Sequence, residues 1–364
     1  MRIALLAHLR HPIAPPFAGG LEAYCWHLAE GLTARGHDVV LFATGDSDPR
    51  FSLDPVSPVH HEKSFPGLEH RGDAGLRAHV DAAYAAALDR IGAGGFDVVH
   101  NNSLSRLPLE RRRTDTVPTL TSLHAPPYDA LRWFVHDSPS PHHRLTATSA
   151  AHLAAWWPDG APPEASVLPN GVDPAAWPFG AEGDGSAAWS GRLTPVKGAH
   201  HAIAAARSAG LPLTLFGPIE EPDYWETAIR PLLGGSIRYG GHLAGSALAA
   251  ELARASLFLF TPCWDEPFGL AAIEAMACGL PVAGFARGAA REVVGEGGCL
   301  VASEDASALA GAIPAALAIP REIPRERVLR LFTRERWLDR CEALYAALRA
   351  GDASSPFPAS RAAP

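Results

Sequence analysis

The sequence predicts an α/β protein built from two doubly wound, Rossmann-like domains, and three observations lead to this prediction. Short apolar runs alternate with helix-length segments, which is typical of βαβ units and parallel sheets. The chain has 364 residues, enough for two domains of about 100–200 residues each. The alternation is interrupted by a turn-forming run at Asn170–Pro174 and a glycine-rich segment at 180–186, after which it starts again.

The first domain opens with an apolar run that turns polar too soon for a secretory signal and is predicted to be a buried strand. A loop carrying Gly19 and Gly20 leads into a helix at 21–35, which Gly36 ends at the position that favours a left-handed residue. The predicted strands of this domain are 3–7, 39–43, 97–100, 119–124 and 166–169, with a further helix at 74–91.

The second domain repeats the alternation from residue 187. Its predicted strands are 187–190, 213–216, 237–239, 257–261, 282–285 and 299–301. Its predicted helices are 198–209, 223–233, 246–255, 268–277, 290–294 and 307–317. A last amphipathic helix is expected at 333–349, and the Ala-, Ser- and Pro-rich residues from Gly351 are expected to form a flexible tail.

Composition excludes several classes of protein. A net charge of −8 disfavours binding to nucleic acid or to an anionic membrane through bulk charge. The five cysteines are widely spaced with no C-x-x-C pair, which fits reduced thiols in the cytoplasm and disfavours a disulfide framework or a zinc cluster. No apolar run reaches the roughly 18 residues of a membrane span. We therefore expect a cytoplasmic protein without a metal site.

Two charged residues follow the first predicted strand of the second domain. Arg192 and Lys197 lie in a loop that opens a helix, where backbone amides and positive side chains together favour an anion such as a phosphate. Lys197 is one of two lysines in a chain that otherwise uses arginine, which favours a role for a compact point charge. The residues alone leave open that both are exposed charges at a helix start.

A second group follows the predicted strand at 257–261. Gly269 lets backbone approach a ligand closely, and the helix predicted to start near Phe268 directs its positive end to the same edge. Glu274 lies in an otherwise apolar helix, where a carboxylate needs hydrogen-bond donors such as ribose or hexose hydroxyls. A solvated helix face is the alternative. Ligands of open α/β sheets lie beyond the carboxyl ends of the strands, so we expect the site in a cleft between the two sheets.

In the first domain the candidates are weaker taken singly. His124 ends a predicted strand before a proline loop, and Gly19 and Gly20 precede a helix. A single histidine at such a position is more often structural, and two loop glycines more often form a simple turn. His100 and Asn102 also end a strand. Three histidine pairs lack the carboxylate pattern of a metal site and are predicted to lie on the surface: 60–61, 142–143 and 200–201.

Taken together, these segments resemble the family 4 glycosyltransferases, retaining enzymes of GT-B fold. The match runs from the first strand to about Leu317, and its motifs occur in the family's order. The opening segment from His11 to Glu22 also looks like a subgroup labelled pterin or small-molecule glucosyltransferases. The motifs are Gly19-Gly20-x-Glu22, the strand-end His124, Pro169–Asp173, Gly191-Arg192-(x4)-Lys197-Gly198, and Glu266-(x7)-Glu274 around Pro267-Phe268-Gly269-Leu270.

The resemblance implies a role for each matched residue. Arg192 and Lys197 would bind the donor diphosphate, Glu266 the hexose hydroxyls and Glu274 the ribose, with His124 near the anomeric centre. Catalytic roles thus fall to His124, Arg192, Lys197 and Glu266. The nucleobase would meet backbone groups of residues 237–242 beside Gly217. Contacts to phosphate and sugar hydroxyls would come from Gly20, Phe268, Gly269 and Leu270.

The implied reaction is transfer of a hexosyl unit from a nucleotide diphosphate sugar, UDP-glucose or similar, to an acceptor hydroxyl, with no cofactor. A small-molecule acceptor is favoured over a lipid. A non-hydrolysing sugar-nucleotide epimerase of the same fold and an inactive nucleotide-sugar binding protein are the alternatives. The implied organisation is an acceptor-side domain (1–172), a donor domain (173–325), a helix that packs back on the first domain (326–350) and the tail (351–364).

Overall fold

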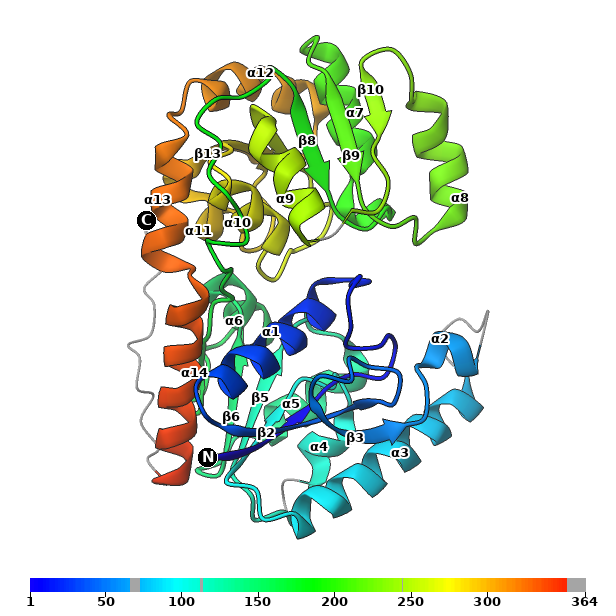
Figure 1. The fold of residues 1–364 in the computed structure, drawn as a ribbon, viewed down its shortest axis with the longest axis vertical. Helices are drawn as coiled ribbons and strands as arrows, with labels where there is room; N and C mark the ends of the chain where they lie inside the picture. The colour runs from blue at the N-terminus through cyan, green and yellow to red at the C-terminus, as the bar shows by residue number, and fades with distance from the viewer. Residues whose placement is uncertain (66–72, 112–113, 244, 352–364) are drawn as a thin grey trace. The chain divides into compact units, whose positions relative to one another are not determined.

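A computed structural model describes residues 1–65, 73–111, 114–243 and 245–351 (Figure 1). The chain divides into two compact units. Unit 1 comprises Met1–Thr148, Leu153–Leu168 and the described residues from 338 onward, and unit 2 comprises Ser149–His152 and Pro169–Trp337. Apart from Gly351, the predicted tail lies outside the described residues. Within the described residues, no helix combines the length and the apolar character needed to cross a bilayer.

Unit 1 contains a parallel sheet in the order β3-β2-β1-β4-β5-β6-β7. Its strands are β1 (Arg2–Leu6), β2 (Asp38–Thr44), β3 (Ser52–Ser57), β4 (Val98–Asn101), β5 (Thr119–Leu123), β6 (His143–Ala147) and β7 (Ala165–Val167). Its helices are α1 (Gly20–Ala34), α2 (His61–Ser64), α3 (Ala74–Ala93), α4 (Arg106–Arg111), α5 (Asp129–Asp137), most of α6 (Ala150–Trp156) and most of α14 (Arg334–Arg349).

The last helix packs within unit 1 on elements from the start of the chain. A Cβ at Gly31 of α1 would lie 2.6 Å from Leu338 Cδ1 of α14, so the missing side chain allows the two helices to approach closely. Tyr345 is fully buried, and its hydroxyl lies 2.7 Å from His100 Nδ1 of β4. Arg35, next to the end of α1, donates 2.7 Å to Asp339 Oδ1. Helix α14 therefore contributes both apolar and polar contacts to this unit.

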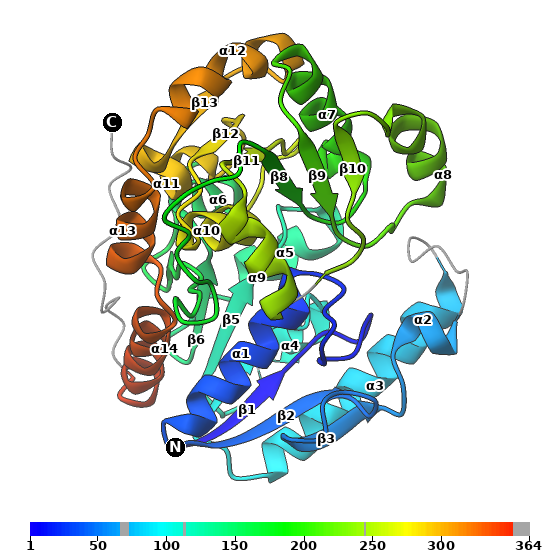
Figure 2. The same cartoon turned by 45° about the horizontal axis from the view of Figure 1, so that its top comes forward.

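Unit 2 repeats the architecture with a parallel sheet in the order β10-β9-β8-β11-β12-β13 (Figures 1 and 2). Its strands are β8 (Ala187–Ser190), β9 (Leu213–Phe216), β10 (Ile237–Tyr239), β11 (Leu257–Phe260), β12 (Val282–Phe285) and β13 (Gly298–Val301). Its α-helices are α7 (Ala199–Ser208), α8 (Pro222–Tyr224), α9 (Gly245–Arg254), α10 (Leu270–Ala277), α11 (Ala290–Val294), α12 (Ala306–Leu317) and α13 (Glu322–Leu331).

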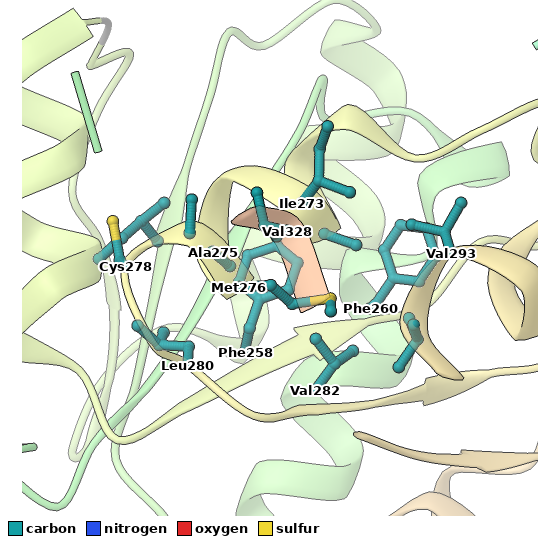
Figure 3. Packing of buried hydrophobic residues seen from close by; sticks show 14 of the residues in the cluster. Phe258, Phe260, Ile273, Ala275, Met276, Cys278, Leu280, Val282, Val293 and Val328 are labelled. Atoms are coloured by element: carbon teal, nitrogen blue, oxygen red, sulfur yellow. The ribbon is translucent and has the colours of Figure 1, made fainter. Parts of the chain in front are cut away.

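The central strands β8, β11 and β12 are apolar on both faces because helices cover both. Successive side chains of a strand point to opposite faces. Phe258 and Phe260 accordingly join one cluster with α9, α10, α11 and α13, whereas Leu257 and Leu259 join another with α7 and α12. Figure 3 shows the first cluster, in which Met276 of α10 packs among Phe258, Phe260 and Val282. This packing fixes α10 against the sheet.

The two predicted doubly wound sheets are confirmed, including the bounds of β8, β9, β10 and β12. Strands β3 and β6 were missed for physical reasons. β3 contains Pro55 and lies at the sheet edge, where a proline is tolerated. β6 buries polar side chains, so it lacks an apolar pattern.

The prediction that the histidine pairs lie on the surface is wrong for His61 and His143, which are buried.

Candidate functional site

The carboxyl ends of β8 and β11 are neighbours in unit 2, at the point where the strand order reverses. The chain runs outward from β8 to β9 and β10, and then returns beside β8 as β11. In open α/β sheets such a switch point leaves a crevice in which ligands bind. The loop after β8 carries Arg192 and Lys197, and the loop after β11 carries Glu266 and Gly269.

Lys197 is held at this edge by close backbone packing between the two loops. The Cys263 amide donates to the Val196 carbonyl at 2.8 Å, and Thr261 Oγ1 donates to the Gly198 carbonyl at 2.9 Å. Gly198 adopts a left-handed φ of 68°, and a Cβ there would overlap the Thr261 carbonyl oxygen. Glycine is therefore required next to Lys197 for two separate reasons.

Lys197, Glu266 and Trp264 form one hydrogen-bonded group. Lys197 Nζ donates to Glu266 Oε2 at 2.6 Å, and Trp264 Nε1 donates to the same oxygen at 2.8 Å. The ammonium also lies 5.0 Å from the centroid of the Trp264 ring, within the range of a cation–π contact. The Glu266 side chain is only 9% exposed, so these two donors offset the cost of burying its charge.

Arg192 lies beside the loop that follows β9. Its Nη1 donates to Glu220 Oε2, and its side chain remains 32% exposed. Gly217, with φ 138°, begins that loop, and a Cβ there would overlap the Gly191 carbonyl oxygen. The Tyr239 hydroxyl donates 2.8 Å to the Gly217 carbonyl. The strand ends of β8, β9 and β10 are thus joined tightly enough that only glycine fits at position 217.

Phe268, Gly269 and Leu270 lead into α10. The helix begins at Leu270, two residues later than predicted, because Gly269 precedes it in a left-handed conformation (φ 100°). A Cβ at Gly269 would lie 2.8 Å from Cζ of Phe260. Phe268 is buried in the cluster beneath. The first turn of α10 therefore lies at the carboxyl edge of the sheet, where the positive end of the helix favours an anion.

Glu274 is half-buried in α10 between the apolar residues Ile273 and Ala275. Among the described residues its carboxylate has no side-chain hydrogen-bond partner. Burial raises the pKa of Glu274 to about 7. A carboxyl group in this state gains from any ligand that supplies hydroxyl donors.

In unit 1 the corresponding switch point lies between β1 and β4, with β5 next in the sheet. His124 follows β5, and its Nε2 lies 2.7 Å from Asn102 Oδ1, after β4. Asn102 Nδ2 donates 3.3 Å to the His100 carbonyl, so Oδ1 is the amide atom that faces His124. His124 Nε2–H therefore donates to Asn102 Oδ1. The Tyr24 ring lies edge-on, 4.5 Å away between centroids.

The loop after β1 contributes a buried ion pair. His8 Nε2 lies 2.9 Å from Glu22 Oε1, and both side chains are less than 10% exposed. Burial opposes ionisation of Glu22, but the hydrogen bond and charge of His8 outweigh it and lower the pKa of Glu22 to about 2. Gly20 is exposed as the first residue of α1, and the preceding Gly19 is extended.

The structure thus places the predicted residues in two groups, one in each unit. Arg192, Lys197, Gly217, Glu266 and the 268–270 segment gather at the strand ends of unit 2. Glu274 lies one turn into α10, and His124 and Gly20 belong to unit 1.

Sequence reasoning missed two residues in unit 2 that hold these charges. Trp264 stands two residues before Glu266 in the loop after a predicted strand. An aromatic residue this close to a candidate carboxylate was the only sequence signal for a contact between the two. Glu220 stands three residues after Gly217, and its negative charge was the only sequence signal that it could pair with Arg192. The sequence placed Asn102 at a strand end but gave no sign of its contact with His124.

Two family models match the chain. Residues 18–176 match the model described as Glycosyltransferase Family 4, and residues 181–329 match the model described as Glycosyl transferases group 1. The glycogen synthase of Mycobacterium tuberculosis is 28% identical, over 89% of this chain and 88% of that protein. The D-inositol 3-phosphate glycosyltransferase of Acidothermus cellulolyticus is also 28% identical, over 86% and 82%.

Solved structures share the fold over almost the whole chain. Sucrose-phosphate synthase from Thermosynechococcus elongatus has a TM-score of 0.77 at 23% identity, covering 96% of this chain and 100% of that one. AviGT4, a glycosyltransferase of avilamycin A biosynthesis, has a TM-score of 0.72 at 24% identity, covering 96% and 98%. Anabaena HepE in complex with UDP and glucose has a TM-score of 0.72 at 18% identity, covering 94% and 98%.

Proposed function

Because this chain belongs to the family 4 glycosyltransferases of GT-B fold, we propose that it transfers a hexosyl unit from a nucleotide diphosphate sugar to an acceptor hydroxyl, with retention of configuration. The observation that carries the proposal is the convergence of Arg192, Lys197, Glu266 and the first turn of α10 on the strand ends of unit 2. In this proposal residues 173–325 bind the donor and residues 1–172 the acceptor.

The donor diphosphate would bind to Arg192 and Lys197. When the bond between the sugar and the diphosphate breaks, negative charge grows on the leaving group, and preorganised cations and amides lower the barrier. Phe268, Gly269 and Leu270 would supply these amides. In the unliganded chain, Glu220 and Glu266 hold the two cations in place.

The two glutamates would bind the hexose and the ribose of the donor. Glu266, held through Oε2, would accept from hexose hydroxyls through its other oxygen. Glu274 would accept from the vicinal ribose hydroxyls, which supply the donors that its half-buried carboxylate lacks among the described residues. The nucleobase would lie beside Gly217 against backbone groups of residues 237–242, where Tyr239 already orders the loop.

His124 would lie near the anomeric carbon, polarising the transferred sugar or orienting the acceptor. Retention would follow a front-face route. The bond from the anomeric carbon to the phosphate oxygen breaks, a bond to the acceptor oxygen forms on the same face, and the leaving phosphate oxygen takes the acceptor proton. Such a route needs no nucleophilic carboxylate from the protein.

UDP-glucose is our first candidate for the donor and a small molecule for the acceptor. Support for UDP comes from the neighbour that was solved with UDP and glucose, and a hydroxyl acceptor agrees with the relatives named as glycosyltransferases. We also propose that turnover requires no divalent metal, since Arg192, Lys197 and the α10 amides supply the positive charge. Turnover should therefore persist in EDTA, and its loss would contradict this part of the proposal.

The test is a thermal-unfolding screen with UDP-, GDP- and ADP-sugars, followed by NMR of the products. A donor that binds the folded state raises the unfolding temperature by mass action. We expect one nucleotide class to stabilise the chain and to release free nucleotide when an acceptor is added. Conversion of the donor without an acceptor would instead identify an epimerase, and binding without turnover across an acceptor panel would identify a binding protein.

A further inference from the structure

Trp264 is the one member of the Lys197–Glu266–Trp264 group with no place in the proposed chemistry. Its side chain is half-buried in the loop after β11. It contacts both partners in different ways, because the indole N–H donates to Glu266 and the ring face lies by the Lys197 ammonium. The three side chains form a closed triangle in which one carboxylate oxygen accepts from two donors.

We infer that Trp264 is a positioning residue that keeps Glu266 in its sugar-binding orientation when the donor diphosphate draws Lys197 away, an inference that rests on the proposed function. Phosphate and Glu266 compete for the same ammonium. If Trp264 did not donate to it, a carboxylate as buried as Glu266 would lose the Lys197 donor at a large cost. The indole N–H removes that cost because it stays on Oε2 while Lys197 changes partner.

The ring face has a separate effect on Lys197. An aromatic face attracts an ammonium without competing for its hydrogen-bond donors. Lys197 therefore keeps one favourable contact whether its donors point to Glu266 or to phosphate. The N–H acts on recognition of the sugar through Glu266, whereas the ring acts on binding of the diphosphate through Lys197.

Two substitutions separate these effects. Trp264→Phe retains an aromatic face and removes the N–H, whereas Trp264→Leu removes both. The matched control is Trp177→Phe, which changes another half-buried tryptophan of unit 2 that packs against the hydrophobic cluster of Figure 3. Circular dichroism and thermal unfolding establish that each variant is folded before ligands are added.

The measurement is calorimetric binding to the full chain of three pairs of probes: UDP with UDP-glucose, GDP with GDP-mannose, and ADP with ADP-glucose. For the pair that the wild type binds, the affinity of the nucleotide sugar relative to its nucleotide isolates the contribution of the sugar. We expect Trp264→Phe to lower this ratio about tenfold or more, as for a lost hydrogen bond to a charged group. Glu266→Gln should lower it similarly, and the double variant no further. The nucleotide itself should bind several-fold more weakly to Trp264→Leu than to Trp264→Phe.

The inference is overturned if the ratio in Trp264→Phe stays within twofold of Trp177→Phe while Glu266→Gln lowers it. It is also overturned if the two losses multiply in the double variant, because independent effects would mean that Trp264 does not act through Glu266. If the wild type binds none of the six probes, the proposed function fails and the role of Trp264 fails with it. The two failures are therefore distinguishable.

Discussion

The two candidate groups are held together by different forces. In unit 2 the polar groups are charged, with Lys197 paired to Glu266 and Arg192 to Glu220. In unit 1 the His8–Glu22 ion pair lies in the loop after β1, whereas His124 is hydrogen-bonded to the uncharged amide of Asn102. The ion pairs of Lys197 and Arg192 can exchange a carboxylate for another anion, whereas the His124–Asn102 hydrogen bond fixes the direction of one donor.

The largest effect should follow loss of a cation in unit 2. Lys197→Ala and Arg192→Ala should each lower kcat by about 10²–10³, by analogy with loss of one oxyanion donor. The matched control is Arg230→Ala, because Arg230 is 65% exposed and pairs with Glu226 in the same unit. Steady-state kinetics with the donor from the screen checks this. Kinetics like those of the wild type in Lys197→Ala would refute its role.

At His124, the second largest effect should follow a change in hydrogen bonding. Asn102→Ala should lower turnover about tenfold or more, because His124 loses the acceptor that fixes its Nε2 proton. Asn102→Asp should shift the pH profile of kcat to higher pH, because a carboxylate would stabilise the protonated imidazole. If the profile of Asn102→Asp matches that of the wild type, Asn102 does not control the protonation of His124.

Glu274 links ligand binding to pH. Its pKa of about 7 in the folded state lies above the usual 4.5, so the folded state holds the proton more tightly and the free energy of unfolding falls as pH rises from about 4.5 to 7. Glu274→Gln lacks this loss and should be about 3 kcal/mol more stable than the wild type at pH 8, with little difference at pH 4.

The same substitution should weaken the binding of the nucleotide about tenfold, since an amide replaces the carboxylate that accepts from ribose. Wild-type affinity should also fall as pH drops below about 7, where Glu274 becomes protonated, and this slope should vanish in Glu274→Gln. Urea unfolding and calorimetry at several pH values measure both effects. A stabilised variant with unchanged nucleotide affinity would exclude Glu274 from the ribose site.

The smallest effect concerns stability alone. Burial lowers the pKa of His100 to about 3, so its imidazole stays neutral between Tyr345 and Ser122. Tyr345→Phe leaves a buried ring nitrogen without its partner and should cost about 1–3 kcal/mol in urea unfolding, with kcat unchanged. Tyr128→Phe, at a 39% exposed position, should cost less than about 0.5 kcal/mol. Equal costs for the two would show that the His100 contact adds nothing.

The same contrast explains how far sequence reasoning reached. Strands β8 and β9 were predicted because runs buried on both faces are continuously apolar, and Arg192 and Lys197 because charges in a strand-end loop stand out. Strand β6 and the His124–Asn102 contact were not predicted, because their buried polar side chains have partners more than 20 residues away in the sequence. Likewise, the contact of Trp264 with Lys197 could not be predicted, because only the fold brings these two residues together.

The most direct test is a crystal structure of the chain with the nucleoside diphosphate that binds it. We expect the diphosphate to contact the Arg192 guanidinium and the Lys197 ammonium at the strand ends of β8 and β11. We also expect Lys197 to have left Glu266 while the Trp264 N–H remains on the carboxylate. A diphosphate bound elsewhere, or one that leaves both ion pairs intact, would refute the proposed donor site.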